Sequence, residues 1–357
     1  LVNAGVLRDE LEASGSIFQS TSDTEVIIHL IATSRETTLM GRIVEALSRA
    51  RGAYSLLFLT LDRMIAARAP MGFRPVVLGE FKSGRTRGFV VASETCALDL
   101  IEAQYLREVE PGEIITFGPK GMESLKPFPP VPHAKCIFEY IYFARPDSNL
   151  YGRNVYLVRK ELGRQLAREN GVEADLVTPV PDSGVPAAIG YAEVSGLPLE
   201  FGLIRNHYVG RTFIEPQESI RHFGVKIKLN AQREVLEGKR VVVVDDSIVR
   251  GTTSRKIVRM LRDAGAKKVH MRISSPPTTG PCYYGIDTPT RSELIASASS
   301  VEEIRKFIDA DSLAYLSHEG MYGFLDGRMQ GFCDACFSGN YPVHFDDEGH
   351  TRQLHLF

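Results

Sequence analysis

The segment Val241–Ser254 combines residue types that could bind a phosphorylated sugar. Four consecutive valines lead into two carboxylates, Asp245 and Asp246, and then into a loop with one glycine, Gly251. Three hydroxyl residues follow: Thr252, Thr253 and Ser254. Ligands bind at the carboxyl ends of such strands, and a loop that opens a helix attracts an anion. The carboxylates suit ribose hydroxyls or a hydrated Mg²⁺. The alternative is a structural turn whose hydroxyls cap the helix.

Two further stretches could contact the same ligand. Pro179–Ala188 follows a predicted strand and opens a helix, as an anion-binding loop should, and it contains Ser183. Arg205–Ile214 is a basic loop, and Lys228–Asn230 follows it. The cations in these stretches are Arg205, Arg211 and Lys228. The structural alternatives are a capped turn and an ordinary basic surface loop.

The cysteines form a second group of chemically active residues. They are Cys96, Cys136, Cys282, Cys333 and Cys336. Five are too few for a disulfide scaffold in a chain of 357 residues, and clustered cysteines in a reducing compartment bind metal or stay as thiols. The Cys-x-x-Cys pair at 333–336 is compatible with zinc, redox chemistry or neither. Cys96 is predicted to be a buried small apolar residue.

The chemistry-bearing loops need a framework, and the second half of the chain predicts one. The predicted helices are Val155–Glu169, Val185–Ser195 and Ser254–Ala264, and the predicted strands are Leu176–Pro179, Leu199–Ile204, Lys239–Val244 and Val269–Ser274. Alternating helices and strands at this spacing predict a parallel, doubly wound sheet. The valine run indicates a strand covered on both faces.

The first part mixes helix and strand. A helix is predicted from Ser22–Glu25 to Ala32, and strands at Tyr54–Leu61, Gly88–Ala92 and Ile114–Phe117. Proline-rich Pro127–Pro132 is the predicted linker. We therefore expect domains at 1–127 and 133–343 and a polar tail at 344–357.

Composition excludes several classes of partner. Apolar residues make up 43% of the chain, enough for packed cores. A net charge of −2 gives no basic field for nucleic acid or a membrane surface, and no apolar run approaches the roughly 18 residues that span a bilayer. We expect a soluble protein without nucleic-acid or membrane partners. Leu1–Glu12 has neither an initiator Met nor the pattern of a signal peptide, so a fragment or processed product is expected.

These motifs together resemble a known family. Val241–Ser254 resembles the signature of type I phosphoribosyltransferases, and Pro179–Ala188 with Arg205–Ile214 narrows the resemblance to the amidophosphoribosyltransferase family. Ser20–Glu25, Pro70–Pro75 and Ser93–Asp99 resemble pieces of its glutaminase domain. The resemblance implies a type I phosphoribosyltransferase fold, preceded by part of an N-terminal-nucleophile glutaminase α+β sandwich.

The resemblance also implies an activity. Family members transfer ammonia, derived from glutamine, to C1 of 5-phosphoribosyl 1-diphosphate, giving 5-phosphoribosylamine, diphosphate and glutamate in the first committed step of purine synthesis. Ser183, Asp245 and Asp246 would place Mg²⁺, and Asp23 would hold the α-amino group of glutamine, with a helix N-cap as its structural alternative. Arg205–Ile214 would close over the substrate and exclude water; His207 stands where the family often has Arg and receives no role. The other implied substrate contacts are Asp245, Asp246, Gly251, Thr252, Thr253, Ser254, Arg205, Arg211 and Lys228.

The resemblance further implies a cofactor and partners. One branch of the family holds a [4Fe–4S] cluster on cysteines in these contexts, which would be Cys136, Cys282, Cys333 and Cys336; zinc and free thiols are the alternatives. A homotetramer, feedback inhibition by purine nucleotides, and a location in the cytoplasm or a plastid are expected.

The glutaminase nucleophile is expected to be missing. The family uses a cysteine at the mature N-terminus, whose α-amino group acts as the base, whereas this chain starts at Leu1. We therefore predict no catalytic nucleophile in the chain and at best an ammonia-dependent reaction. A salvage phosphoribosyltransferase acting on a nucleobase and a ligand-sensing regulator are the competing interpretations; the regulator would need a DNA-binding module, which the sequence does not indicate.

Overall fold

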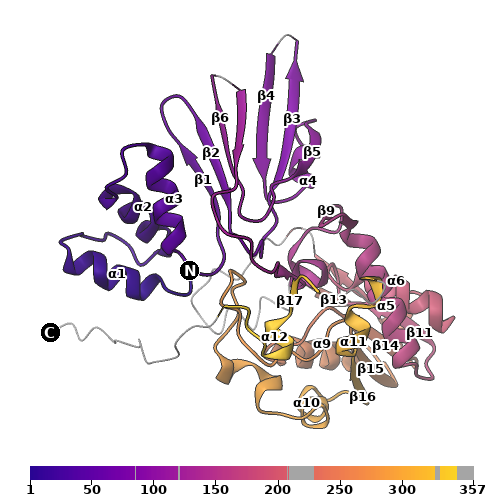
Figure 1. Ribbon diagram of the computed structural model, residues 1–357. Helices are drawn as coiled ribbons and strands as arrows, with labels where there is room; N and C mark the ends of the chain where they lie inside the picture. The colour runs from indigo at the N-terminus through magenta and orange to yellow at the C-terminus, as the bar shows by residue number, and fades with distance from the viewer. Residues whose placement is uncertain (85, 120, 207, 209–228, 326–329, 344–357) are drawn as a thin grey trace.

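A computed structural model describes residues 1–84, 86–119, 121–206, 208, 229–325 and 330–343. The chain forms two parts that follow one another in sequence (Figure 1). None of the described helices is long and apolar enough to cross a membrane.

The first part stacks helices on two antiparallel sheets (Figure 1). Its helices are α1 (Ala4–Ala13), α2 (Asp23–Thr33), α3 (Leu39–Arg49) and the short α4 (Cys96–Asp99). One sheet has the order β1 (Ser55–Leu59), β2 (Met64–Arg68), β6 (Ile114–Gly118), β7 (Gly121–Leu125); the other has the order β4 (Thr86–Ala92), β3 (Val77–Ser83), β5 (Gln104–Glu108). Ile27 and Ile43 pack α2 and α3 onto Ile65 of β2. On the opposite face, Ile115 of β6 packs against Leu78 of β3. Side chains of β2 and β6 alternate between the two faces of their sheet. One face therefore packs against the helices and the other against the second sheet.

The second part is built on a parallel sheet with helices on both faces. Its strand order is β11 (Leu176–Pro179), β14 (Arg240–Asp245), β15 (Lys268–Ile273), β16 (Ser312–Tyr315). Val242 and Val244 face α5 (Val155–Glu169) and α6 (Val185–Ser195). The alternate side chains, Val241 and Val243, face α9 (Thr252–Asp263) and α10 (Val301–Ile308). The predicted doubly wound fold is confirmed, and the four valines are buried because both faces are covered.

Short elements connect this framework. They are β8 (Lys135–Cys136), the π-helix η1 (Glu139–Phe143), β9 (Asn149–Leu150), β10 (Arg153–Asn154), β12 (Leu203–Arg205), β13 (Leu229–Ala231), α8 (Arg233–Leu236), η3 (Arg291–Glu293), η4 (Ile295–Ser297), α11 (His318–Met321), η5 (Gly323–Leu325), β17 (Phe332–Cys333) and α12 (Ala335–Ser338).

The predicted strand at Leu199–Ile204 is wrong at its centre, because residues 200–202 are not in a strand. Leu199 forms only an isolated bridge to Val177 of the parallel sheet. The chain then turns at Gly202, and Leu203–Arg205 pairs antiparallel with β13 instead. A single apolar run is therefore divided between two sheets, which its composition does not reveal.

Candidate functional site

Two adjacent carboxylates end the central strand β14. Asp245 and Asp246 are 7% and 6% exposed. The backbone N–H of Asp246 donates to Asp245 Oδ1 at 2.9 Å, and Ser247 Oγ donates to Asp246 Oδ2 at 2.8 Å. Burial and the neighbouring Asp246 raise the pKa of Asp245 well above its usual range. A buried pair of this kind favours a cation or a hydroxyl-bearing ligand.

The loop after the carboxylates turns sharply into α9. Gly251 has φ 73°, a left-handed conformation that favours glycine. Thr252 and Thr253 are exposed in the first turn of α9, whereas Ser254 is buried at 3%. The free N–H groups of this first turn form the anion-binding end of a helix.

The loop between β11 and α6 lies beside the carboxylate loop. Pro179 pairs with Val244, and the N–H of Val180 donates to Val244 O at 2.9 Å. A Cβ on Gly184 would lie 2.4 Å from Val244 O, so the close approach of this loop to the end of β14 requires glycine. Ser183, in this loop, is partly exposed. The structure therefore brings together two loops that lie more than sixty residues apart in sequence.

Of the three basic residues predicted to contact the substrate, only Arg205 lies within the described part of the chain. Arg205, at the end of β12, pairs with Asp182 in the loop before α6. Sequence reasoning gave Asp182 no role, although its place between Pro181 and Ser183 was the available signal. Arg211 and Lys228, like His207, lie outside the described residues.

Arg159 lies behind the carboxylates and was also missed. It is 3% exposed, and its guanidinium donates to Tyr140 O and Ala144 O, both at 2.7 Å. Burial lowers the pKa of Arg159, while the charge of Asp246 opposes this shift, so the two groups lie within electrostatic range. In sequence, Arg159 is one of several charged residues in an amphipathic helix, and nothing marks it as buried.

Asp23 lies at the start of α2, far in sequence from the loops that follow β11 and β14. Its carboxylate pairs with the α-ammonium group of Leu1. The helix is capped by Ser22, whose side chain accepts from the N–H of Thr24 at 3.3 Å. The alternative assignment of Asp23 as the N-cap is therefore wrong.

The four predicted ligand cysteines come from three distant segments. Cys136 of β8 lies opposite Cys333 of β17 in the parallel pairing of these two strands. Cys336 O accepts from the N–H groups of Thr279 and Gly280 at 2.9 and 3.1 Å, which places Cys336 close to the loop of Cys282. Cys96 is separate and buried in α4, as predicted.

Electrostatics relate these four thiols to one another. Burial, followed by the charges of the other three cysteines, raises the pKa of Cys336 well above its usual range. Burial and the charges of Cys282 and Cys333 act on Cys136 in the same direction. The four side chains therefore lie within mutual electrostatic range. Within the described part of the chain, however, no three or more His, Cys, Asp or Glu are grouped so as to hold a metal ion.

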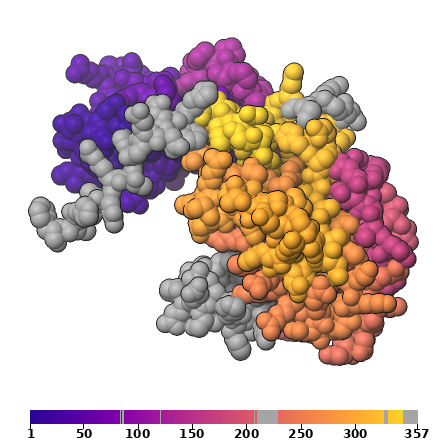
Figure 2. Space-filling model, turned by 90° about the horizontal axis from the view of Figure 1, so that it is seen from below, coloured from indigo at the N-terminus to yellow at the C-terminus, as the bar shows by residue number. Residues whose placement is uncertain are grey.

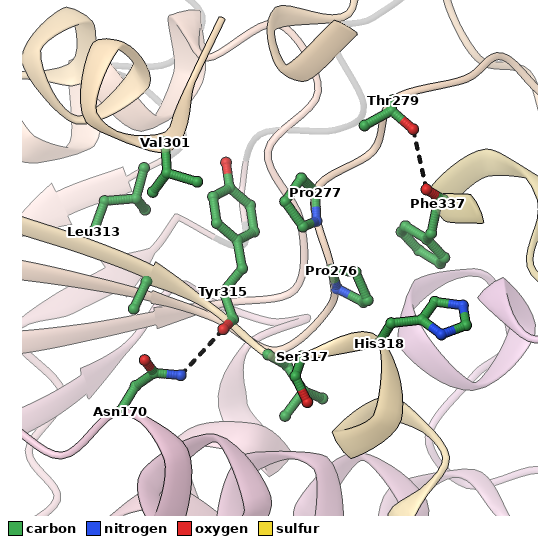
Figure 3. A pocket seen from close by; sticks show the side chains of 12 residues that line it. Asn170, Pro276, Pro277, Thr279, Val301, Leu313, Tyr315, Ser317, His318 and Phe337 are labelled. Atoms are coloured by element: carbon green, nitrogen blue, oxygen red, sulfur yellow. Dashed lines mark hydrogen bonds between the residues drawn. The ribbon is translucent and has the colours of Figure 1, made fainter. Parts of the chain in front are cut away.

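A separate pocket opens at the carboxyl end of β16 (Figure 3). Its volume is about 500 Å³, and Tyr315, Leu313, Pro276, Pro277 and Phe337 provide most of its apolar wall. The Tyr315 hydroxyl is buried without a hydrogen-bond partner. None of the predicted site residues lines this pocket, so it is distinct from the carboxylate site.

Comparison with known proteins matches both parts. The family model described as a glutamine amidotransferase domain matches residues 1–100, and the one described as a phosphoribosyl transferase domain matches residues 150–274. The chain therefore joins a domain of each kind, as its fold and its carboxylate site indicate.

Longer matches define the family. The chain is 57% identical to chloroplastic amidophosphoribosyltransferase 1 of Arabidopsis thaliana, over 96% of the chain and 60% of the relative. It is 55% identical to amidophosphoribosyltransferase of Bacillus subtilis, over 96% of the chain and 72% of the relative. A solved structure of the Bacillus subtilis glutamine phosphoribosylpyrophosphate amidotransferase, complexed with ADP and GMP, matches with a TM-score of 0.90 and 55% identity, covering 98% of this chain and 76% of that one. The chain belongs to the amidophosphoribosyltransferase family. It spans 60% of the length of the Arabidopsis relative.

Proposed function

We propose that this chain carries the synthase part of an amidophosphoribosyltransferase, which transfers ammonia to C1 of 5-phosphoribosyl 1-diphosphate. The products are 5-phosphoribosylamine and diphosphate, and in the intact protein glutamine supplies the ammonia. The observation that supports this proposal most strongly is that one chain contains both a glutamine amidotransferase domain and a phosphoribosyl transferase domain. A salvage enzyme needs only the second domain.

The residues divide into two binding loops. Gly251, Thr252, Thr253 and Ser254 would hold the 5-phosphate at the start of α9, and the loop with Ser183 would hold the diphosphate. Arg205 is placed to exchange its contact with Asp182 for the anionic substrate. Arg211 and Lys228 are proposed as further phosphate contacts, on the family resemblance alone. Positioning of this kind, together with fixed dipoles, supplies most of the catalysis expected for such a transfer.

Magnesium fits the carboxylate pair. Asp245 and Asp246 are buried next to one another, and the pKa of Asp245 is raised first by burial and then by the charge of Asp246, which a divalent ion would offset. We propose that Asp245, Asp246 and Ser183 would hold Mg²⁺, directly or through its water shell, since Mg²⁺ keeps several waters beside phosphates. When bound, the ion would neutralise charge on the departing diphosphate.

Four cysteine thiolates suit an iron–sulfur cluster or zinc, and the family resemblance favours the cluster. The β8–β17 pairing and the hydrogen bonds between Cys336 and the Cys282 loop bring the three segments that carry these cysteines together. We propose a [4Fe–4S] cluster that ties β8 and β17, near the start and end of the second part, to the Cys282 loop.

The remaining proposals concern the glutaminase part, the domain boundary, the nucleotide inhibitors, the location and the oligomeric state. We propose, from the family resemblance, that Asp23 holds the α-amino group of glutamine. We place the domain boundary in the proline-rich segment 127–132. Inhibition by purine nucleotides is proposed from the family resemblance, with support from the ADP and GMP named for the Bacillus subtilis structure. A cytoplasmic location is proposed, with a plastid as the alternative that the chloroplastic names of the plant relatives support. A homotetramer is proposed from the family resemblance.

The test is a direct assay of the chain with phosphoribosyl diphosphate, Mg²⁺ and ammonium chloride. Diphosphate release is expected with ammonium, and little is expected with glutamine. Asp245→Asn should reduce the rate about a hundredfold, the usual effect of removing one fixed electrostatic contact. The matched control is Asp263→Asn at the exposed end of α9, which should keep the rate. Diphosphate release with nucleobases but not with ammonium would instead identify a salvage enzyme, and no release with any acceptor would contradict the proposal.

A further inference from the structure

A segment outside the recognised motifs contacts residues 246–251, which we call the phosphoribosyl loop. The loop joins β14 to α9, and the support comes from η3 and η4, which follow the Cys282 loop. The backbone N–H of Ile295 donates to Val249 O at 2.9 Å. This hydrogen bond attaches the middle of the loop to the start of η4.

A charge pair makes the second attachment. Arg250 Nε and Nη2 donate to Glu293 Oε1 at 3.1 and 2.9 Å. The other carboxylate oxygen of Glu293 accepts from the N–H and Oγ1 of Thr290, at 3.1 and 3.0 Å. The capping box of η3 therefore fixes the orientation of the Glu293 carboxylate independently of its contact with Arg250. The bonds from Arg250 and Thr290 keep the pKa of Glu293 below its usual range.

Apolar side chains make the third attachment. A Cβ on Gly251 would lie 3.0 Å from Ile295 Cδ1 and 3.1 Å from Phe307 Cε1. The left-handed turn at Gly251 is thus packed against η4 and α10. Three successive loop residues, Val249 to Gly251, are held by three different kinds of contact.

We propose that Glu293 is a positioning residue for the phosphoribosyl loop, which acts by holding Arg250 so that the loop's N–H groups keep the geometry that binds the 5-phosphate. The inference rests on the proposed function, because it concerns the same substrate site. A loop that must be ordered on binding loses affinity to the ordering entropy, whereas a loop held in advance does not. Glu293 therefore affects substrate affinity rather than the chemical step.

The experiment compares the full chain with its Glu293→Ala variant. Binding of phosphoribosyl diphosphate with Mg²⁺ is measured by calorimetry, and KM and kcat are measured with ammonium. Glu293→Ala should weaken binding and raise KM by about two- to fivefold, the range of a partly exposed charge pair, with kcat little changed. The control is Glu302→Ala in α10, which removes a similar exposed pair with Arg305 at 2.7 and 2.8 Å. It should change neither quantity.

A double-mutant cycle separates positioning from a general structural effect. If Glu293 acts through Arg250, then Glu293→Ala should have no further effect in an Arg250→Gln background. Additive effects, an unchanged KM in Glu293→Ala, or a fall confined to kcat would each overturn the inference. If the wild-type chain does not bind phosphoribosyl diphosphate, the proposed function fails and the inference fails with it. If the wild type binds and the variants match it, the inference alone fails.

Discussion

The contact between α5 and α6 gives a strong prediction, because two glycines allow the helices to touch through their backbones. A Cβ on Gly163 would lie 1.9 Å from Ala187 O, and a Cβ on Gly190 would lie 1.9 Å from Lys160 O. No side chain can move aside, since the obstructing atoms are backbone carbonyls. Gly163→Ala must therefore push the two helices apart. The N-terminus of α6 follows the proposed diphosphate loop, so the displacement should reach the site.

The expected loss of stability in Gly163→Ala is the difference between two opposing effects. Overpacking a core costs about 1–3 kcal/mol and occasionally more, and a clash with backbone belongs at the upper end. Replacing glycine by alanine within a helix returns about 1 kcal/mol. The net loss should be about 2 kcal/mol, which lowers Tm by about 4–8 °C in a domain of this size.

Urea and thermal unfolding of Gly163→Ala measure this loss. The control is Gly171→Ala, just beyond the same helix, where the new Cβ would lie 3.5 Å from Ala167 O in ordinary contact. The control should match the wild type within about 0.5 kcal/mol. The KM for phosphoribosyl diphosphate should rise in Gly163→Ala alone. A Gly163→Ala protein as stable as the control would refute the close helix contact on which the reasoning depends.

Three further predictions concern titration, the diphosphate loop and the cysteines. Burial, opposed by Arg74, raises the pKa of Glu139 from 4.5 to about 7; the folded state therefore binds this proton more tightly, and stability should fall by about 3 kcal/mol as pH rises from about 4.5 to about 7. Glu139→Gln should abolish most of that fall in urea titrations at several pH values, and an unchanged pH profile would contradict it. Gly184→Ala would place a Cβ 2.4 Å from Val244 O, so calorimetry should show binding of phosphoribosyl diphosphate weakened at least about tenfold; wild-type affinity would be inconsistent with the close loops. Cys336→Ser should lower the iron content of anaerobically purified protein while Cys96→Ser keeps it, and equal iron in both variants would rule out Cys336 as a ligand.

Local sequence signals located the framework closely. The predicted limits of α5, β11 and α6 coincide with the observed ones. Their ends are marked by residues that act locally: Asn154 caps α5, and Gly196 ends α6 in a left-handed conformation. The strand and the helix on either side of the Asp245–Gly251 loop were predicted for the same reason, since their pattern is continuous in sequence; the ligand of this loop stays a prediction.

The residues that were missed depend on contacts distant in sequence. Arg159 is buried because carbonyls of Tyr140 and Ala144 accept its hydrogen bonds, and Glu293 meets Arg250 across forty-three residues. Neither partner is visible from periodicity or composition. The Leu199–Ile204 strand was wrong for a related reason, because its division between two sheets depends on where Val177 and β13 lie.

The two parts of the chain are joined by more than their linker. In Figure 2 the yellow C-terminal residues lie between the first part and the orange residues of the second. The N–H of Cys136 donates to Phe73 O of the first part, at 2.9 Å, while β8 itself pairs with β17.

The π-helix η1 extends this connection towards the carboxylate site. Glu139 of η1 pairs with Arg74 of the first part at 3.2 Å, and the carbonyls around it accept from Arg159, which lies within electrostatic range of Asp246. A π-helix is a rare conformation that is frequent at functional sites. Here it contacts Arg74 of the first part through Glu139 and Arg159 of α5 through its carbonyl groups, so it joins the first part to α5.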